Sequence, residues 1–187
     1  VTSAIADVVE RHGTVDVLVN NAGVGARGAV ETMSMESAQR LMETNFWGPI
    51  RCIRAVLPSM RAQRSGVIVN VSSIASRVPC TAYTSMYGAS KSALNAVSEA
   101  LASEVEPFGI RVVSIEPGFF ETAITDNNLD RDRAVDGPYA ADEAWIQSFF
   151  DAGVGNGAAP TIVADVIVKA ATDPSTRLHT TVGEDAD

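Results

Sequence analysis

Cysteine, histidine and aromatic residues are scarce in this sequence. The 187 residues include two cysteines, two histidines and 6% aromatic residues. Cys52 and Cys80 are too few for a disulfide framework, which is typical of a protein of the reducing cytoplasm. His12 and His179 are far apart in the sequence and unpaired with any acidic motif, and Cys52 sits in the apolar stripe of a predicted helix. We therefore expect no zinc site and no other metal.

The sequence also lacks clustered basic residues and long apolar runs. Its 14 lysines and arginines face 23 acidic residues, which gives a formal net charge of −9. Because phosphate contacts need clustered Lys and Arg, nucleic acid and anionic membranes are not expected partners. No signal-peptide pattern and no stretch of about 20 apolar residues is present, so we predict no membrane span and a cytoplasmic location.

What the chain does contain is a regular alternation of helical and strand patterns. With 46% hydrophobic residues, residues 1–187 are long enough for one domain with a substantial core. We expect helices at 2–11, 34–61, 83–106, 141–150 and 161–171, and strands at 15–19, 67–71, 111–115 and 179–182. Nearly continuous apolar strands separated by helices indicate a parallel sheet covered on both faces. The predicted fold class is a doubly wound α/β domain.

Tyr87 and Lys91 lie four residues apart in a predicted helix, so their side chains share one face. A phenol has a reference pKa of about 10, and proton transfer near neutral pH requires a shift of roughly three units, or about 4 kcal/mol. One cation about 4 Å away, at an effective dielectric of 20, supplies roughly that energy. The pair therefore predicts that Lys91 lowers the pKa of Tyr87 and makes it a proton carrier. Such a pair also occurs by chance, so the spacing needs support.

Four further motifs supply that support. They are Asn20-Asn21-Ala22-Gly23 after one strand, Asn45 inside a long helix, Ser72-Ser73 after a second strand and Pro117-Gly118 after a third. In this order, and with the Tyr87 and Lys91 pair, they resemble the short-chain dehydrogenase/reductase family from about residue 15 to the C-terminus. The resemblance implies a Rossmann-like fold and reversible hydride transfer between NAD or NADP and a carbonyl carbon, without a metal.

The resemblance also implies catalytic roles for four residues. Tyr87 donates or takes the proton, and Lys91 lowers its pKa and binds the nicotinamide ribose. Ser73 orients the reacting oxygen; it is preferred to Ser72 because its separation from Asn45 matches the usual interval of the family. Asn45 bends its helix and completes a water relay to the lysine. The residues alone are also consistent with a simple helix kink at Asn45 and with turn residues at the two serines.

The cofactor-binding residues implied by the resemblance come from three loops and one helix. They are Asn20, Ala22, Gly23, Tyr87, Lys91, Pro117, Gly118, Phe120 and Thr122. The amide of Asn20 is expected to tie neighbouring strands, while Ala22 and Gly23 let the cofactor ribose approach bare backbone. The backbone around Phe120 and the hydroxyl of Thr122 would meet the nicotinamide carboxamide.

A glycine pattern after the first strand is a competing cofactor motif. Gly23-Val24-Gly25-Ala26-Arg27-Gly28 matches G-x-G-x-x-G. Its last glycine does not open a helix, since residues 29–33 intervene before a helix start at Ser34, and Glu43, at the distance of the usual acidic residue, is itself helical. The first three strands of the family have no counterpart here. We therefore expect a fragment, the C-terminal two-thirds or so of the domain, whose missing part would decide between NAD and NADP.

Substrate and partners are less closely defined by the sequence. Residues 125–150 form a polar section that in such enzymes covers the substrate. The aromatic residues in or near it, Phe119, Tyr139, Trp145, Phe149 and Phe150, favour a lipophilic or ring-containing alcohol or ketone, and the tail at 173–186 resembles members that act on such compounds. Small residues after Lys91 would let another helix approach closely, and in the family this helix meets its twin in a second copy, so the resemblance implies a homodimer or homotetramer.

Two other classes of protein remain as alternatives. A serine hydrolase using Ser72 or Ser73 would need a G-x-S-x-G elbow and a well-placed histidine, and the sequence has neither. A non-catalytic binding or interaction fragment stays open, because the segment that would hold the adenosine and pyrophosphate is missing.

Overall fold

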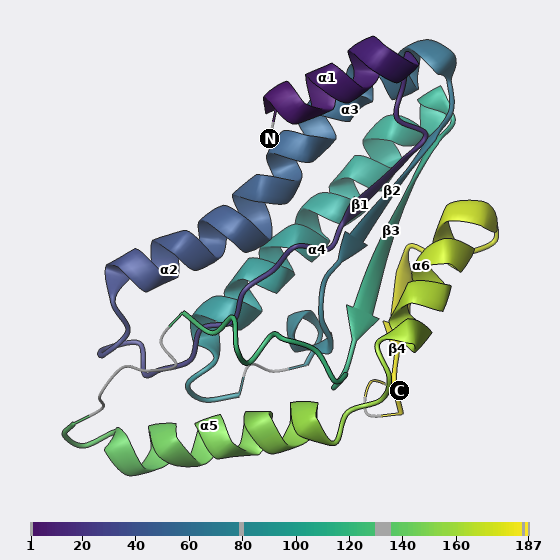
Figure 1. Ribbon diagram of the computed structural model, residues 1–187. Coiled ribbons are helices and arrows are strands. Elements are labelled where there is room, and N and C mark those ends of the chain that lie inside the picture. Colours follow the sequence, from purple (N-terminus) through teal and green to yellow (C-terminus); the bar gives the residue numbers. More distant parts are fainter. Residues whose placement is uncertain (1, 79–80, 130–135, 185, 187) are drawn as a thin grey trace.

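The computed structural model describes residues 2–78, 81–129, 136–184 and 186. Within them, four parallel strands form one sheet in the order β1-β2-β3-β4 (Figure 1). The strands are β1 (Val17–Asn20), β2 (Gly66–Val71), β3 (Ile110–Pro117) and β4 (His179–Val182). The register pairs Val19 with Val69 and Ser114 with His179. The predicted parallel α/β sheet is confirmed.

Six helices connect and flank the strands in the described residues. They are α1 (Thr2–His12), α2 (Met35–Met42), α3 (Gly48–Gln63), α4 (Ser85–Val105), α5 (Ala140–Gly155) and α6 (Thr161–Thr172). The helix expected at 34–61 is three consecutive pieces, α2, the π-turn η1 (Glu43–Trp47) and α3. The hydroxyl of Ser34 caps α2 by accepting from the backbone N–H of Ser37. Helix α5 continues five residues beyond the expected end, to Gly155.

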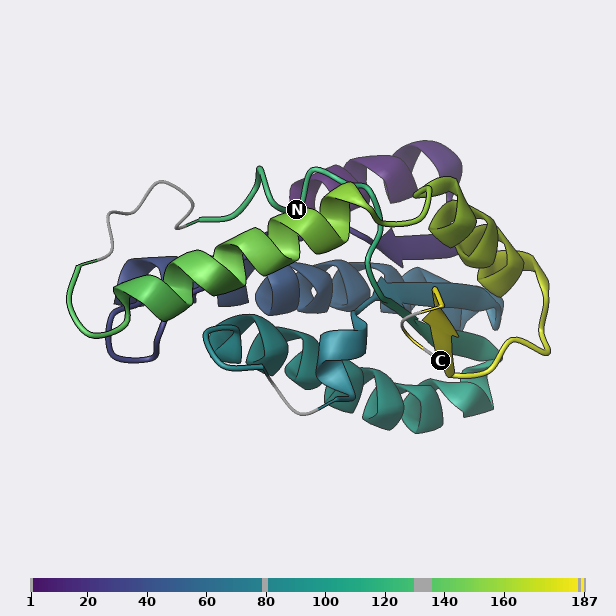
Figure 2. The ribbon, with the colours of Figure 1, turned by 90° about the horizontal axis from the view of Figure 1, so that it is seen from below.

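The core has two halves because successive strand residues point to opposite faces of the sheet. Helices α3 and α4 cover one face and α6 the other (Figure 2). On β2, Ile68 packs against Met60 of α3 and Leu101 of α4. The next residue, Val69, packs against Ala170 of α6. This two-sided burial of a parallel sheet is the doubly wound, Rossmann-like arrangement.

One glycine fixes how α3 and α4 meet at the amino end of the sheet. Gly109 follows the short turn η3 (Glu106–Phe108) with φ = +72°. A Cβ at this position would collide with the carbonyl oxygen of Arg64, the left-handed residue that ends α3. Only glycine therefore combines this backbone conformation with the close approach that leads into β3.

Helix α5 lies across the carboxyl ends of the strands (Figures 1 and 2). In a parallel sheet with crossover helices, this is the end at which ligands bind. At the outer edge of the sheet, Val17 and Val19 of β1 are each 39% exposed, whereas Val113 of β3 is 1% exposed. None of the described helices is long and apolar enough to cross a membrane.

Candidate active site

A cavity of about 960 Å³ opens at the carboxyl ends of β1, β2 and β3. All but two of the residues predicted for catalysis or cofactor binding line it: Ala22, Gly23, Ser73, Tyr87, Lys91, Pro117, Gly118, Phe120 and Thr122. The two exceptions are Asn20 and Asn45, which lie behind its wall. Motifs spread over about a hundred residues of the sequence are thus brought to one place by the crossovers of the sheet.

Tyr87 and Lys91 occupy the first turns of α4 and share one face, as their spacing predicts. The Lys91 Nζ lies 5.9 Å from the centre of the Tyr87 ring and donates a hydrogen bond to the carbonyl oxygen of Val71, at 2.9 Å. Lys91 is 5% exposed. The side chains of Ser73 and Tyr87 are hydrogen-bonded to each other. Ser73, rather than Ser72, is therefore the serine in contact with the phenol; the Ser72 hydroxyl donates to the carbonyl oxygen of Lys91.

Burial dominates the protonation of this pair. It raises the pKa of the Tyr87 phenol, and the hydrogen bond from Ser73 and the charge of Arg27 only partly oppose it. Burial also lowers the pKa of Lys91 to about 8. The sequence led us to expect that Lys91 lowers the pKa of Tyr87, and the structure differs. The reason is geometric, since the ammonium group is directed at the Val71 carbonyl, and the phenol is largely surrounded by protein although the side chain keeps some exposure to the cavity.

Asn45 lies in the π-turn η1, so the predicted irregularity of the helix is confirmed. Asn45 is 1% exposed, and its side-chain amide binds the backbone of Val24 on both sides: Nδ2 donates to O at 3.0 Å, and Oδ1 accepts from N at 2.9 Å. Nδ2 also donates to the Ser90 hydroxyl. A Cβ on Gly23 would lie 3.4 Å from the Asn45 Oδ1 and 3.6 Å from the Lys91 Nζ. Asn45 thus fixes the loop after β1 beside Lys91, while its water relay stays a prediction.

Asn20 ties strands together, as expected. Its Nδ2 donates to Asn70 Oδ1 on β2 at 2.8 Å, and Asn70 Nδ2 donates in turn to Ser98 Oγ on α4 at 2.8 Å. All three side chains are buried. Asn20 therefore contributes to the site indirectly, by linking β1 to β2 and, through Asn70, to α4.

Sequence reasoning missed Arg27, which lines the cavity from the loop after β1. Its side chain is 10% exposed, and its guanidinium lies 4.4 Å from the ring centre of Phe150. Nη1 donates to Gln147 Oε1 at 3.1 Å, so Arg27 links this loop to α5. The available signal was a cation just after a strand, at the end of the sheet where ligands bind.

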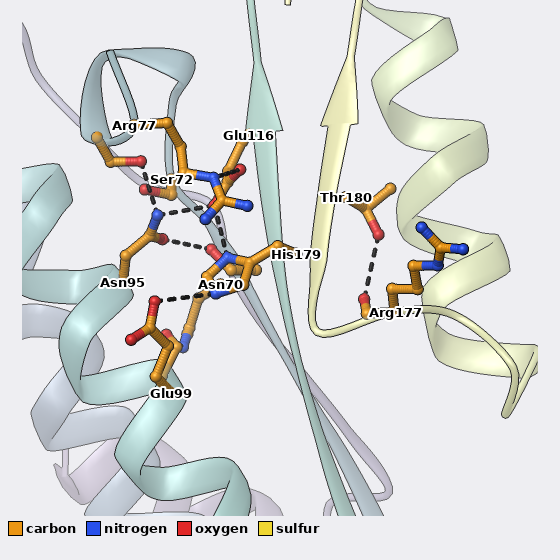
Figure 3. A network of polar contacts seen from close by, with 12 residues as sticks. Asn70, Ser72, Arg77, Asn95, Glu99, Glu116, Arg177, His179 and Thr180 are labelled. Atoms are coloured by element: carbon orange, nitrogen blue, oxygen red, sulfur yellow. Dashed lines mark hydrogen bonds and ion pairs between the residues drawn. The ribbon is translucent and has the colours of Figure 1, made fainter. Parts of the chain in front are cut away.

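His179 is not unpaired, so this part of the sequence reasoning is wrong. Its Nδ1 lies 2.7 Å from Glu116 Oε1, and its Nε2 lies 3.0 Å from Glu99 Oε1 (Figure 3). The parallel pairing of β3 and β4 brings together residues that are 63 apart in the sequence. Among the described residues, no group of His, Cys, Asp and Glu could hold a metal ion. Cys80 lies outside those residues.

The aromatic residues expected at the substrate side divide into two groups. Phe119 and Phe150 line the cavity and pack edge to face at 5.6 Å. Trp145 and Phe149 stack on each other at the surface, 64% and 48% exposed. Tyr139 turns away and donates to Glu31. Of the section expected to cover the substrate, residues 130–135 lie outside the described part of the chain, and the first part of α5 forms its C-terminal portion.

The residues around the cavity fit the nicotinamide end of a dinucleotide. Gly23 and Gly118 present bare backbone to the cavity, and a side chain at Gly23 would fill the space beside Lys91. The Lys91 ammonium group and the Tyr87 hydroxyl are the polar groups a ribose would meet there. The doubly wound sheet defines a Rossmann-like domain, and the cavity lies at the end of the sheet where such domains bind nucleotides.

Comparison with known proteins gives the family. The sequence model of the short chain dehydrogenase family matches residues 1–133. The chain belongs to the short-chain dehydrogenase/reductase family.

The chain spans about half the length of the curated relatives it matches. It is 46% identical over 127 residues to a 3-ketodihydrosphingosine reductase of Bacteroides thetaiotaomicron. The aligned residues make up 68% of this chain and 47% of the relative. It is 36% identical over 170 residues to dehydrogenase/reductase SDR family member 7B of Danio rerio. This alignment includes 91% of this chain and 51% of the relative.

Solved structures of the same family superpose closely. A short-chain dehydrogenase from Streptomyces avermitilis matches with a TM-score of 0.83 and 38% identity, over 99% of this chain and 66% of that one. A gluconate 5-dehydrogenase from Burkholderia cenocepacia, in complex with NADP and tartrate, matches with a TM-score of 0.77 and 25% identity, over 99% of this chain and 69% of that one.

Proposed function

We propose that this chain is the catalytic part of an NAD(P)-dependent oxidoreductase that interconverts an alcohol and a carbonyl compound. The observation that carries the proposal is the meeting of Ser73, Tyr87 and Lys91 at one wall of the cavity, with the phenol hydrogen-bonded to the serine. Two findings support it: the 3-ketodihydrosphingosine reductase among the relatives is named for a ketone reduction, and a solved neighbour holds NADP.

Each residue has a distinct task in this reaction. When bound, the nicotinamide ring supplies or accepts the hydride. Tyr87 gives its proton to the carbonyl oxygen during reduction and takes it back during oxidation. Ser73, which already binds the phenol, donates a hydrogen bond to the same oxygen and orients it. Lys91 would hold the ribose hydroxyls of the cofactor with its ammonium group.

The substrate we propose is lipophilic or ring-containing. Phe119, Ile124, Phe150 and Val154 are among the apolar side chains that line the cavity. Long-chain ketones or flat ring ketones bury apolar surface well in such a cavity. The proposed cofactor is NAD or NADP, without preference between them. We further propose that the chain acts within a longer polypeptide, and as a homodimer or homotetramer.

The test replaces Tyr87 by Phe in the full-length protein that carries this chain. Reduction of phenanthrenequinone, a lipophilic aromatic ketone, is followed by the loss of NADPH or NADH absorbance. Removing a general acid costs about 100-fold to 10,000-fold in rate, so the Tyr87→Phe variant should lose at least about 100-fold in kcat. A rate within a few-fold of wild type would show that Tyr87 is not the acid.

The alternative is a non-catalytic module with the same fold. Calorimetric titration of NADPH into the chain alone and into the full-length protein separates the two. We expect weak binding by the chain alone and micromolar binding by the full-length protein. Tight binding by the full-length protein, without turnover of any ketone or alcohol tested, would favour the binding module.

A further inference from the structure

Glu116 is a fully buried carboxylate at the end of β3, directly before the Pro117-Gly118 turn. Its Oε1 accepts from Asn95 Nδ2 and lies the same distance, 2.7 Å, from His179 Nδ1. Its Oε2 pairs with Arg77 Nε at 3.0 Å (Figure 3). One buried carboxylate thus contacts residues from α4, from β4 and from the turn after β2.

A stabilising role alone does not account for this group. Removing a carboxylate from water costs several kcal/mol, and even well-made buried ion pairs return little net stability. An apolar side chain would fill the space between β3 and α4 at no such cost. What the carboxylate adds is direction, because the hydrogen bond to Oε1 sets the position of Asn95, while Oε2, which makes no hydrogen bond, attracts the Arg77 guanidinium by charge.

From Glu116, a chain of short hydrogen bonds leads to Ser73. The same Asn95 Nδ2 that donates to Glu116 also donates to Ser76 Oγ at 2.7 Å. The Ser76 hydroxyl donates to the carbonyl oxygen of Ser73 at 2.6 Å. On the other side of Asn95, Oδ1 accepts from the hydroxyl of Ser114 at 2.6 Å. Asn95 is therefore held at both ends of its amide and can move little.

Arg77 adds a second attachment to the same turn. It directly follows η2 (Ile74–Ser76), whose first turn is capped by Ser73. Glu116 therefore holds this turn at two consecutive residues, at Ser76 through Asn95 and at Arg77 by the ion pair. The backbone of Ser73 is fixed from behind, while its side chain faces Tyr87 in the cavity.

We propose that Glu116 is a positioning residue for the reaction: acting through Asn95, Ser76 and Arg77, it holds the turn that aims Ser73 at the reacting oxygen. The proposal rests on the proposed function for its catalytic consequence, and on geometry alone for the ordering of the turn. A serine that must meet a substrate oxygen within hydrogen-bond distance loses effect when its backbone shifts by about 1 Å.

His179 and Glu99 form the far end of the network and provide the matched control. Glu99 contacts His179 Nε2 but makes no described contact with Ser76 or Arg77. Replacing Glu99 by Gln changes the charge beside His179, as replacing Glu116 by Gln does, yet leaves the path to Ser73 untouched. If Glu116→Gln and Glu99→Gln differ in their effects, the cause is therefore the hydrogen-bond chain from Glu116 to Ser73 and not the loss of a charge beside His179.

The first experiment measures hydrogen–deuterium exchange of the peptide covering residues 73–78, in the full-length protein. We expect Glu116→Gln and Asn95→Ala to speed exchange of this peptide by about tenfold, since local opening becomes easier by about 1.4 kcal/mol. Glu99→Gln should leave it unchanged. Asn95→Ala keeps the Arg77 and His179 pairs of Glu116, so it remains informative should Glu116→Gln fold poorly. Unchanged exchange in Asn95→Ala overturns the proposal.

The second experiment is a double-mutant cycle on the reduction of phenanthrenequinone. We expect Glu116→Gln to lower kcat about tenfold in the wild-type background, with the cofactor KM unchanged, and to have almost no further effect in a Ser73→Ala background. An equal loss in both backgrounds would mean that Glu116 acts on stability and not through Ser73. If the wild-type protein reduces no ketone, the proposed function fails, while the exchange experiment still decides whether Glu116 orders the turn.

Discussion

The two walls of the cavity are built in opposite ways. The α4 wall, which consists of α4 and the turn η2, is anchored by buried polar side chains: Ser90, Lys91, Asn95, Ser98 and Glu116 are each no more than 5% exposed. The α5 wall consists of α5 and the loop at 24–33. Within α5 only Glu143, Ile146 and Val154 are buried, and Trp145 is 64% exposed.

Under the proposed function, this difference would separate the residues of the chemical step from those that meet the substrate. On the α4 wall, the side chains that would carry the proton are held by the sheet core and by buried hydrogen bonds, which rarely open. Within the α5 wall, Glu143 and Gln147 accept hydrogen bonds from Ala29 and Arg27 of the loop, and Asp142 accepts a bond from Tyr83 outside the wall. The exposed bond between Tyr83 and Asp142 costs little to break, so under the proposed function α5 would be the wall that admits and covers the substrate.

The largest effect is expected on the α4 wall, at the side chain that meets the substrate oxygen. Ser73→Ala removes a directed donor in a water-poor site, which costs about 100-fold to 1,000-fold in kcat. Unfolding by urea should change little, because within the described residues the Ser73 side chain is bonded to Ala75 N and the Tyr87 hydroxyl. Ser72→Ala is the control, with activity close to wild type. A greater loss at Ser72 would mean that the two serines have been assigned the wrong way round.

The second prediction uses the buried ammonium of the same wall. Because the pKa of Lys91 is about 8 in the folded chain and about 10.5 when unfolded, the unfolded chain binds more protons between these values. Stability from this residue therefore rises with pH in that window, by about 2 kcal/mol between pH 8 and about pH 10. Above pH 10 the raised pKa of Tyr87 acts in the opposite direction.

Urea unfolding of wild type and Lys91→Met at several pH values checks this prediction. Since Met carries no proton, wild type should gain about 2 kcal/mol of stability relative to Lys91→Met between pH 8 and about pH 10. A difference that stays constant from pH 7 to pH 10 would mean that Lys91 is solvated in the folded state.

The two walls also differ in how well the sequence predicts them. On the α4 wall, the Tyr87 and Lys91 pair is local, and Asn45 and Ser73 follow elements whose type is plain from hydrophobic periodicity. The contacts of the α5 wall join distant residues: Arg27 and Gln147 are 120 apart in the sequence. The pairing of His179 with Glu116 depends on the register of β3 and β4, which no local pattern specifies. The direction of the Tyr87 pKa shift required knowing how deeply the phenol is buried.

A smaller effect is expected where α5 is attached to the loop after β1. Glu143 Oε1 accepts from Ala29 N at 2.9 Å and from Thr32 Oγ1 at 2.7 Å, in a buried position. Glu143→Ala should cost about 1–3 kcal/mol in stability, since a buried donor is left without its acceptor. Proteolysis should then cut first within or next to α5. Asp142→Ala, which breaks only the exposed bond to Tyr83, should cost less than about 0.5 kcal/mol.

The smallest effect is expected at Arg27, which interacts with both walls. Its charge lowers the pKa of Tyr87, and its Nη1 donates a hydrogen bond to Gln147. Arg27→Met removes both the charge and the bond, whereas Gln147→Leu removes the bond and keeps the charge. Without the charge the pKa of Tyr87 rises, so the falling limb of the pH profile for ketone reduction should move to higher pH, by less than about one unit. Gln147→Leu should leave that limb in place and change only the substrate KM by a few-fold. If both variants move the limb equally, α5 itself shapes the surroundings of the phenol, and the two walls do not act separately.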